Sequence, residues 1–226
     1  MSNYANAFLL TDDERAIAKG KEKGTSVFTV ATSYPERFNF EGVTAYKIVE
    51  TEGDAMGDFL YLPTLTDEKT VDAVIDAVLG RDAKLIVSAC YSLGEIGVID
   101  ARYKLSPIQL LHKLGLLEKC TVVGGVFLDR DDIDLMAQCG TPLVLCPTSS
   151  MGYGYGTPHF CAYDGKLEVS LGSGDNRFNE SGDMLVEARA LVLGVNSEMR
   201  GEVLSAEKAI TLIGGNEHNA HKKLFG

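Results

Sequence analysis

One segment combines the residue types that ligand binding most often uses. The segment Thr141 to Pro158, TPLVLCPTSSMGYGYGTP, opens with a short apolar strand that ends at a proline. A small-residue turn with Ser149 and Ser150 follows, and glycines then alternate with Tyr153 and Tyr155. Glycine lets the backbone approach a ligand closely, and tyrosine gives a flat wall with a polar tip. We interpret this stretch as a site loop, although an exposed linker with a serine-capped turn also fits the pattern.

Two further strands are followed at once by polar side chains. Tyr91 and Glu95 come after the apolar run at 84–90, and Asp175 and Arg177 come after the run at 168–171. A buried carboxylate beside an apolar wall can act as a general base without metal, so Glu95 and Asp175 are the candidate catalytic residues. The candidate ligand-binding residues share polar or aromatic tips after strands, and are Tyr91, Ser149, Ser150, Tyr153, Tyr155 and Arg177.

The cysteine and histidine residues give less evidence for a functional site than the residues named above. The five cysteines show no CxxC spacing, and their odd number argues against a disulfide framework, which favours free thiols in a reducing cytoplasm. Cys90 and Cys146 end apolar strands, but no histidine is placed in sequence to activate either, so we predict core thiols. His159, just past the tyrosine loop, is a weak site candidate.

The elements that must position these residues read as alternating strands and helices. Continuous apolar strands separated by helices are typical of a parallel sheet covered on both faces. The pattern predicts a single α/β domain over residues 1–226, a TIM-like barrel with seven recognisable strands, one short of the usual eight. The expected strands are 26–32, 43–49, 59–62, 84–90, 121–127, 142–146 and 168–171, and the expected helices are 11–23, 67–79, 106–117, 131–139, 182–193 and 205–213.

The composition of the chain limits the classes of partner that it can bind. The chain has 226 residues and a formal net charge of -11, which disfavours a nucleic-acid partner because such binding depends on basic patches. No apolar run approaches the roughly 20 residues of a membrane span, and the first residues lack a signal-peptide pattern. We therefore expect a cytoplasmic protein whose partner is a small molecule.

From Leu105 to Leu212 the chain resembles the metal-dependent amidohydrolases of the chlorohydrolase, cytosine-deaminase and adenosine-deaminase-like group. Its run LDRDDIDLMAQCGTPLVLCPTSSMGYGYGTP resembles that group's helix and "H.P.SN..L..G..P" loop. SLGSGDNRFNESGDMLVEAR resembles the "LGTDG...N..LDM..E.R" segment, and LSAEKAITLIGG resembles the closing helix. Upstream, KGTSVFTVAT resembles the "SGTTTVVD" strand, and the segment through KLIVSACYSLGEIG resembles the one carrying "H.AE...EV".

The resemblance implies a divalent metal held by histidines at strand ends and by a carboxylate after the last strand. In this sequence those positions are emptied, and we expect neither a metal ion nor another cofactor. The residues that fall there are Ser88, Tyr91, Gly124, Leu145 and either Gly174 or, after a shift of one residue, Asp175.

The resemblance also implies a first barrel strand with an HxH motif and an accessory β-sandwich, and we expect both to be missing or altered in this chain. An incomplete barrel would expose strand edges. We expect the gap to be covered by the segment Asn3 to Leu10 or by another copy of the chain.

Three functions remain open. The first is a metal-free relative that binds a small molecule or a partner at the barrel mouth, with an intact paralogue as one possible partner. The second is an enzyme with metal-free acid–base chemistry in the same pocket. The third is a metal-dependent hydrolase or deaminase acting on C–N bonds, in which Glu95, His159 and Asp175 are displaced ligands. Barrels host unrelated chemistries, so the fold alone cannot choose between them.

Overall fold

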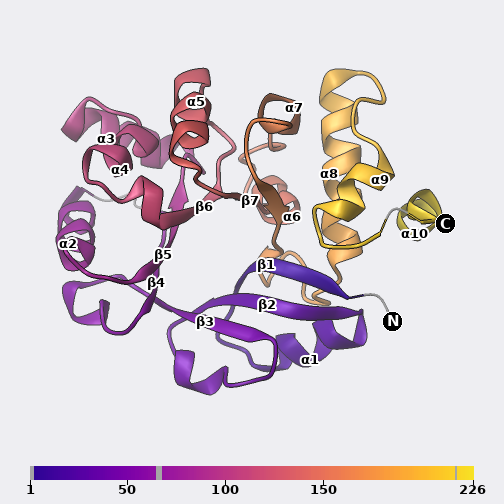
Figure 1. Ribbon diagram of the computed structural model, residues 1–226, viewed down its shortest axis with the longest axis horizontal. Coiled ribbons are helices and arrows are strands. Elements are labelled where there is room, and N and C mark those ends of the chain that lie inside the picture. The colour runs from indigo at the N-terminus through magenta and orange to yellow at the C-terminus, as the bar shows by residue number, and fades with distance from the viewer. Residues whose placement is uncertain (1–2, 65–67, 217) are drawn as a thin grey trace.

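The strands form one parallel sheet that curls into a barrel (Figure 1). The computed structural model describes residues 3–64, 68–216 and 218–226. Within them the sheet has nine strands in the order β8-β7-β6-β5-β4-β3-β2-β1-β9. Their bounds are β1 Tyr4–Leu10, β2 Thr25–Thr32, β3 Val43–Ile48, β4 Phe59–Leu62, β5 Lys84–Ala89, β6 Cys120–Gly124, β7 Leu143–Leu145, β8 Val169–Leu171 and β9 Gly174–Asp175.

The sheet returns to its first strand through one split strand. β8 pairs with β7, β9 pairs with β1, and only Gly172 and Ser173 separate β8 from β9. Asn6 of β1 bridges this break, because its amide oxygen accepts from the Ser173 N–H at 3.0 Å and its amide nitrogen donates to the Ser173 hydroxyl at 2.7 Å. A Cβ on Gly172 would lie 2.5 Å from the Phe8 carbonyl oxygen, so only glycine allows the close approach.

This closure corrects the expected architecture. The segment Tyr4–Leu10 is a full strand between β2 and β9, so the first strand is not missing but altered, since it carries no HxH motif. Of the two ways to cover the gap, the amino-terminal segment is the one the structure uses. The count of seven strands was also short, because β1 was not recognised and β9 has only two residues.

The described helices include four that the sequence pattern did not predict. The helices are α1 Arg15–Glu22, α2 Glu68–Val78, α3 Leu93–Tyr103, α4 Pro107–Lys113, α5 Arg130–Cys139, α6 Pro147–Gly152, α7 Phe160–Tyr163, α8 Met184–Met199, α9 Ala206–Thr211 and α10 Ala220–Phe225, of which α3, α6, α7 and α10 were missed. The expected helix at 67–79 begins at Glu68, and residue 67 lies outside the described residues.

The late start of α1 and the presence of α6 each have a local cause. The first helix starts at Arg15 rather than near Thr11, because the Asp13 N–H bonds to the Thr11 hydroxyl at 3.0 Å and holds a turn there. α6 begins at Pro147, where we expected a loop. Proline fits the first turn of a helix as well as it ends a strand, so the same residue does both.

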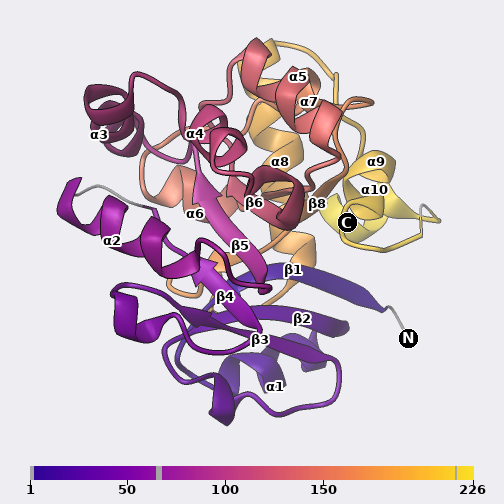
Figure 2. The same cartoon turned by 60° about the vertical axis from the view of Figure 1, so that its left-hand side comes forward.

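The barrel wall is not evenly covered. Helices pack against the strands from β5 to β8, whereas β2 and β3 are followed only by the short 3-10 turns Pro35–Arg37 and Glu52–Asp54. Figure 2 shows α1 beneath β2 and β3 and the larger group of helices on the opposite side. No helix of the described residues is long and apolar enough to cross a membrane.

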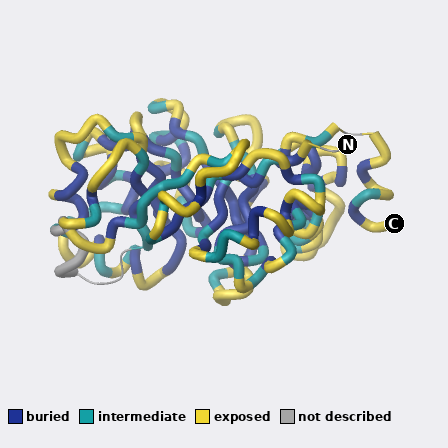
Figure 3. The backbone as a smooth tube through the Cα atoms, turned by 90° about the horizontal axis from the view of Figure 1, so that it is seen from below, coloured by how far each residue is buried: buried dark blue, intermediate teal, exposed yellow. Residues whose placement is uncertain are grey.

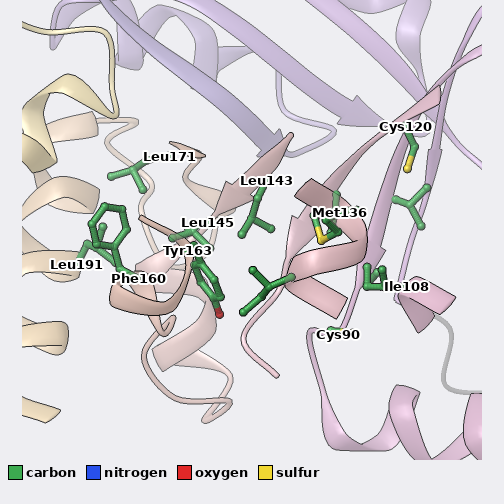
Figure 4. Close-up of a cluster of buried hydrophobic side chains, with 14 of the residues drawn as sticks. Cys90, Ile108, Cys120, Met136, Leu143, Leu145, Phe160, Tyr163, Leu171 and Leu191 are labelled. Carbon is green, nitrogen blue, oxygen red and sulfur yellow. The ribbon is translucent and has the colours of Figure 1, made fainter. Parts of the chain in front are cut away.

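Two apolar regions hold the barrel together. The outer one joins the strands to the helices and includes Met136, Leu143, Tyr163 and Leu171, whose side chains converge in Figure 4. In Figure 3 the buried backbone runs through the middle of the molecule and exposed segments lie around it. The inner region fills the barrel with side chains from six strands and from the end of β7: Phe8, Ala31, Tyr61, Ile86, Val123, Val144 and Cys146. The barrel is therefore a packed core, as in other closed barrels of this size.

Candidate functional site

A cavity of about 300 Å³ opens at the carboxyl ends of the strands. Because all strand pairs are parallel, the loops that follow them meet at this rim, which is where barrel proteins place their sites. We call it the aromatic cavity, since five of its lining residues are aromatic. Its lining is Phe8, Leu10, Tyr61, Pro63, Thr64, Tyr91, Tyr153, Tyr155, Gly174 and Asp175.

One wall is the tyrosine group predicted from the sequence. The Tyr153 and Tyr155 N–H groups donate at 2.9 Å to the Ser149 and Ser150 carbonyls, so both tyrosines continue directly from α6. The rings of Tyr153 and Tyr155 stack at 5.3 Å with an angle of 21°, and Tyr91 meets Tyr155 edge-on at the same distance. Offset and edge-on pairs of this kind stabilise one another beyond their buried area. The wall is thus a set of rings in mutual contact, and backbone hydrogen bonds to α6 hold Tyr153 and Tyr155 in place.

The opposite wall was missed from the sequence. Phe8 of β1 and Tyr61 of β4 pack at 5.0 Å, and the Tyr61 hydroxyl lies 2.9 Å from the Ser88 hydroxyl. Tyr61 stands in the run FLYL, whose last residues had to face a rim once a parallel sheet was assumed. That reasoning could have found Tyr61, whereas Phe8 needed β1 to be recognised as a strand.

Asp175 and Arg177 form the polar edge of the cavity. The Arg177 guanidinium pairs with the Asp175 carboxylate at 2.7 Å and donates to the Tyr153 hydroxyl at 2.7 Å, and that hydroxyl donates to Asp175. Partial burial raises the pKa of Asp175, but the hydrogen bonds from Arg177 and Tyr153 outweigh it and hold the pKa below its ordinary value. The carboxylate is therefore ionised and fixed in place.

Ser149 and Ser150 support the site from beneath. Ser149 donates to the Ser173 carbonyl at 3.0 Å and accepts from the Asp175 N–H at 2.9 Å, while Ser150 donates to the Cys146 carbonyl at 2.9 Å. Both serines are fully buried and bond the backbone, which favours the turn-capping alternative, and direct contact with a ligand stays a prediction. Their hydroxyls form hydrogen bonds with the backbone of the two segments that carry Tyr153 and Asp175.

A buried carboxylate that the sequence did not single out joins the same two segments. Glu187 of α8 is fully buried and accepts from the Thr148 N–H at 3.0 Å, the Thr148 hydroxyl at 2.6 Å and the Asn179 amide at 2.8 Å. Burial raises the pKa of Glu187 to about 7, although these hydrogen bonds act to lower it. The matched run N..LDM..E.R was the only signal for this residue.

Glu95, the other candidate catalytic carboxylate, lies inside the protein. It is 1% exposed and accepts from the Tyr91 N–H at 3.0 Å, while its own N–H donates to the Ser92 hydroxyl at 3.2 Å. Burial raises the pKa of Glu95 to about 8. The side chain therefore caps the start of α3, an arrangement that the Ser-x-x-Glu spacing should have predicted.

The cysteines and His159 lie apart from the cavity chemistry. Cys90 and Cys146 are buried, and burial raises the pKa of both thiols well above the ordinary value, as expected for core thiols. His159 lines a separate cavity of about 280 Å³ between α7 and the end of α8.

A second cavity, of about 540 Å³, shares Leu10 and Asp175 with the first. We call it the charged cavity, because its other lining residues are mostly ionic. Arg15 pairs with Asp13 at 2.8 Å in this lining, and both side chains are exposed. The lining residues not shared are Thr11, Asp12, Asp13, Arg15, Arg37, Asn176, Arg177 and Glu180.

The residues at the strand ends do not fit a catalytic metal ion. Zinc needs imidazole, thiolate or carboxylate donors, but Ser88, Gly124 and Leu145 stand at the matched ends of β5, β6 and β7. The barrel centre between them holds the Phe8 and Tyr61 rings. In the part of the chain that the structure describes, no three His, Cys, Asp or Glu side chains are grouped so that they could hold a metal ion.

Two comparisons relate the chain to known proteins, and no protein-family model matches it. Over 121 residues it is 31% identical to a 5-methylthioadenosine/S-adenosylhomocysteine deaminase of Pyrococcus furiosus, covering 52% of the chain and 29% of the relative. The Pyrococcus abyssi protein of the same name is 34% identical over 97 residues, which cover 42% of the chain and 23% of that protein. The matches thus span less than a third of these relatives' length.

Solved structures match over more of the chain. An adenosine deaminase from Xanthomonas campestris with bound zinc superimposes with a TM-score of 0.70 at 14% identity, covering 94% of this chain and 65% of the other. A guanine deaminase from C. acetobutylicum with bound guanine gives a TM-score of 0.71 at 14% identity, over 88% and 59%. These matches establish the fold, and the sequence matches agree with it. The resemblance to metal-dependent amidohydrolases is therefore confirmed.

Proposed function

We propose that this amidohydrolase-like chain binds a small molecule in the aromatic cavity and does so without a metal ion. The observation that carries the proposal is the contrast, at the rim of the barrel, between an aromatic cavity and strand ends without metal donors. Ring surfaces and one fixed ion pair line a cavity of about 300 Å³, a size that accommodates a small ligand, while the strand ends lack a set of metal donors.

The first test is metal content. Protein purified natively without chelators and measured by elemental analysis should contain well under one equivalent of zinc, iron or manganese. Near-stoichiometric metal would reject the metal-free proposal and redirect the search to ligands near Asp175.

The second test is binding itself. Ligand-observed NMR with a set of small heteroaromatic and ammonium compounds should give hits that disappear in Tyr155→Ala, which removes one ring of the cavity wall. Phe40→Ala is the matched control, because it removes a 39% exposed ring outside the cavity and should keep every hit. A screen without hits, or hits that both variants retain, would reject the aromatic cavity as the binding site.

A second candidate function is hydrolysis of a C–N bond, as in the deaminases that the relatives are named for. The names of the relatives favour this function, whereas the absence of metal-binding side chains at the ends of β5, β6 and β7 argues against it. Ammonia release from 5-methylthioadenosine by zinc-supplemented protein, at a rate that Asp175→Asn abolishes, would replace our proposal with this one.

Metal-free acid–base catalysis in the cavity has weaker support. Asp175 is ionised and reaches the cavity, but it is already bound by Arg177 and Tyr153. Glu95 is enclosed by the start of its own helix. We rank this function below simple binding.

A subunit role is compatible with the binding proposal. We propose that the chain works beside another copy or an intact relative, which would supply any catalysis. A single monomer mass in light scattering at high concentration, together with no relative retained during native purification, would reject this part.

A further inference from the structure

The aromatic cavity offers ring surface more than hydrogen-bonding groups. The Tyr61 hydroxyl is taken by Ser88, and the Tyr153 hydroxyl by Asp175 and Arg177. The Tyr91 hydroxyl is buried and lies beside the Ser150 side chain. Apart from Asp175 and the hydroxyls of Tyr155 and Thr64, a ligand therefore meets mainly the rings of the tyrosines and of Phe8.

A carboxylate that is paired with Arg177 stands at the edge of these rings. The Asp175 side chain is 14% exposed, and its counter-ion Arg177 is 71% exposed, so the carboxylate lies on the cavity side and the guanidinium on the solvent side. The whole chain carries a net charge of -11. Cations are attracted to such a protein over distances of about a Debye length, and anions are repelled.

The ring system already holds one cation. The guanidinium carbon of Arg177 lies 5.5 Å from the centre of the Tyr153 ring and 5.7 Å from that of Phe178. Aromatic faces carry partial negative charge and attract cations at this distance. Tyr153 stacks on Tyr155, which in turn meets Tyr91, so the same electron-rich set extends from Arg177 into the cavity.

The form of the cation follows from the scarcity of free acceptors. A primary ammonium group has three N–H donors and loses hydrogen bonds to water when ring surfaces surround it. A quaternary ammonium group has no N–H, so it loses none, and its methyl groups pack well against rings. The cavity volume of about 300 Å³ leaves room for such a head group with a short tail.

We infer that the aromatic cavity binds the methylated or quaternary ammonium head of a small organic cation. This inference rests on the proposed function, since it names the ligand class of the same cavity. Neutral heterocycles, the class that the guanine-bound structural neighbour represents, are the competing ligands.

Calorimetric titration with three probes tests the charge and the methyl groups separately. Choline is the quaternary probe, ethanolamine is its primary-amine counterpart, and dimethylbutanol is the neutral isostere with carbon in place of nitrogen. Cation–π attraction of about 0.5–2 kcal/mol corresponds to roughly 2- to 30-fold, so choline should bind at least about 2-fold tighter than the other two. Equal affinities of choline and the neutral isostere, or tighter binding of ethanolamine, would overturn the inference.

A pair of variants separates ring electrons from apolar surface. Tyr155→Phe keeps the ring and should change choline affinity less than about 3-fold, whereas Tyr155→Leu keeps apolar bulk and should weaken it at least about 5-fold. Equal choline affinities in the two variants would contradict a cation–π site, and circular dichroism of both confirms that each is folded.

The outcomes also separate the inference from the proposed function. Neutral heterocycles that bind in a Tyr155-dependent way, with no binding of choline at millimolar concentration, would overturn the cation and leave the binding cavity intact. No binding of any compound would reject both.

Discussion

The aromatic cavity and the charged cavity lie side by side at the same rim and share Asp175, yet they are built in opposite ways. The aromatic cavity stands on buried hydrogen bonds from Ser149 and Glu187, which join α6 to the segment after β9. The charged cavity is lined by ion pairs such as Arg15 with Asp13, whose side chains are 84% and 38% exposed. Exposed pairs contribute little, whereas a buried polar group that loses its partner costs much. The two cavities should therefore respond differently to the same kind of damage.

Removing the buried carboxylate should have the largest effect. Glu187→Ala removes the acceptor of the part-buried Thr148 N–H and hydroxyl and one of the two acceptors of the Asn179 amide, at about 1–3 kcal/mol for each buried group left unsatisfied. We expect a loss of about 3 kcal/mol in the free energy of unfolding, measured by urea denaturation, together with loss of ligand binding. Glu187→Gln keeps one acceptor oxygen and should lose less than half as much. Equal losses in the two variants would contradict the acceptor role.

Replacing Gly174, the residue before Asp175, should have the second-largest effect on stability. Gly174 has φ +64°, and a Cβ there would lie 2.4 Å from the Ser149 hydroxyl oxygen. Gly174→Ala combines left-handed strain of about 1–2 kcal/mol with this clash. Gly154→Ala is the matched control, because Gly154 has φ +76° and open space around its Cβ position. Thermal melts should place Gly174→Ala clearly below Gly154→Ala, and identical midpoints would show that the contact with Ser149 is unimportant.

The buried carboxyls should make stability depend on pH. The pKa of Glu95 rises to about 8 and that of Glu187 to about 7, from 4.5 in the unfolded chain. Between those limits the folded state holds protons that the unfolded state has released, so stability is greatest near pH 4.5 and falls as the pH rises toward 8. Each group adds a slope of up to about 1.4 kcal/mol per pH unit.

Urea titrations at several pH values check this slope. Glu95→Gln cannot ionise and should remove most of the slope between pH 7 and 8, where Glu187 has already released at least half of its protons. An unchanged slope in that window would mean that Glu95 is ionised in the folded protein.

The smallest effect should come from the charged cavity. Arg15→Ala removes an ion pair at its exposed edge and should leave the unfolding midpoint and ligand affinity unchanged within error. A marked loss of affinity would show that the charged cavity takes part in binding, which would weaken the contrast drawn above.

Much of the barrel could be predicted from the sequence, because β2 to β8 are apolar runs bounded by glycine, proline or charged residues. β1 escaped because Asn6 interrupts its apolar pattern, and Asn6 is buried only because it bonds Ser173, which is 167 positions away. β9 has too few residues to show any pattern. α6 escaped because Pro147 fits a break and a helix start equally well.

The site was predictable to the extent that its residues follow strands. Tyr91, Tyr153, Tyr155, Asp175 and Arg177 do, and the structure places them around one or both of the two neighbouring cavities. Which hydroxyls face the cavity and which face the backbone depends on packing, so Ser149 and Ser150 could not be assigned in advance. Neither could Phe8, whose strand comes from the far end of the chain.

The split strand that closes the ring has a consequence for biosynthesis. β1 leaves the ribosome before its partner β9, which follows only after about 160 more residues have been made. Until then the outer edge of β1 has no strand to pair with, and pairings between such distant segments form slowly. A circular permutant that starts at Thr25 and carries residues 3–24 after Phe225 would reverse this order, because β1 would then be made after both of its neighbours.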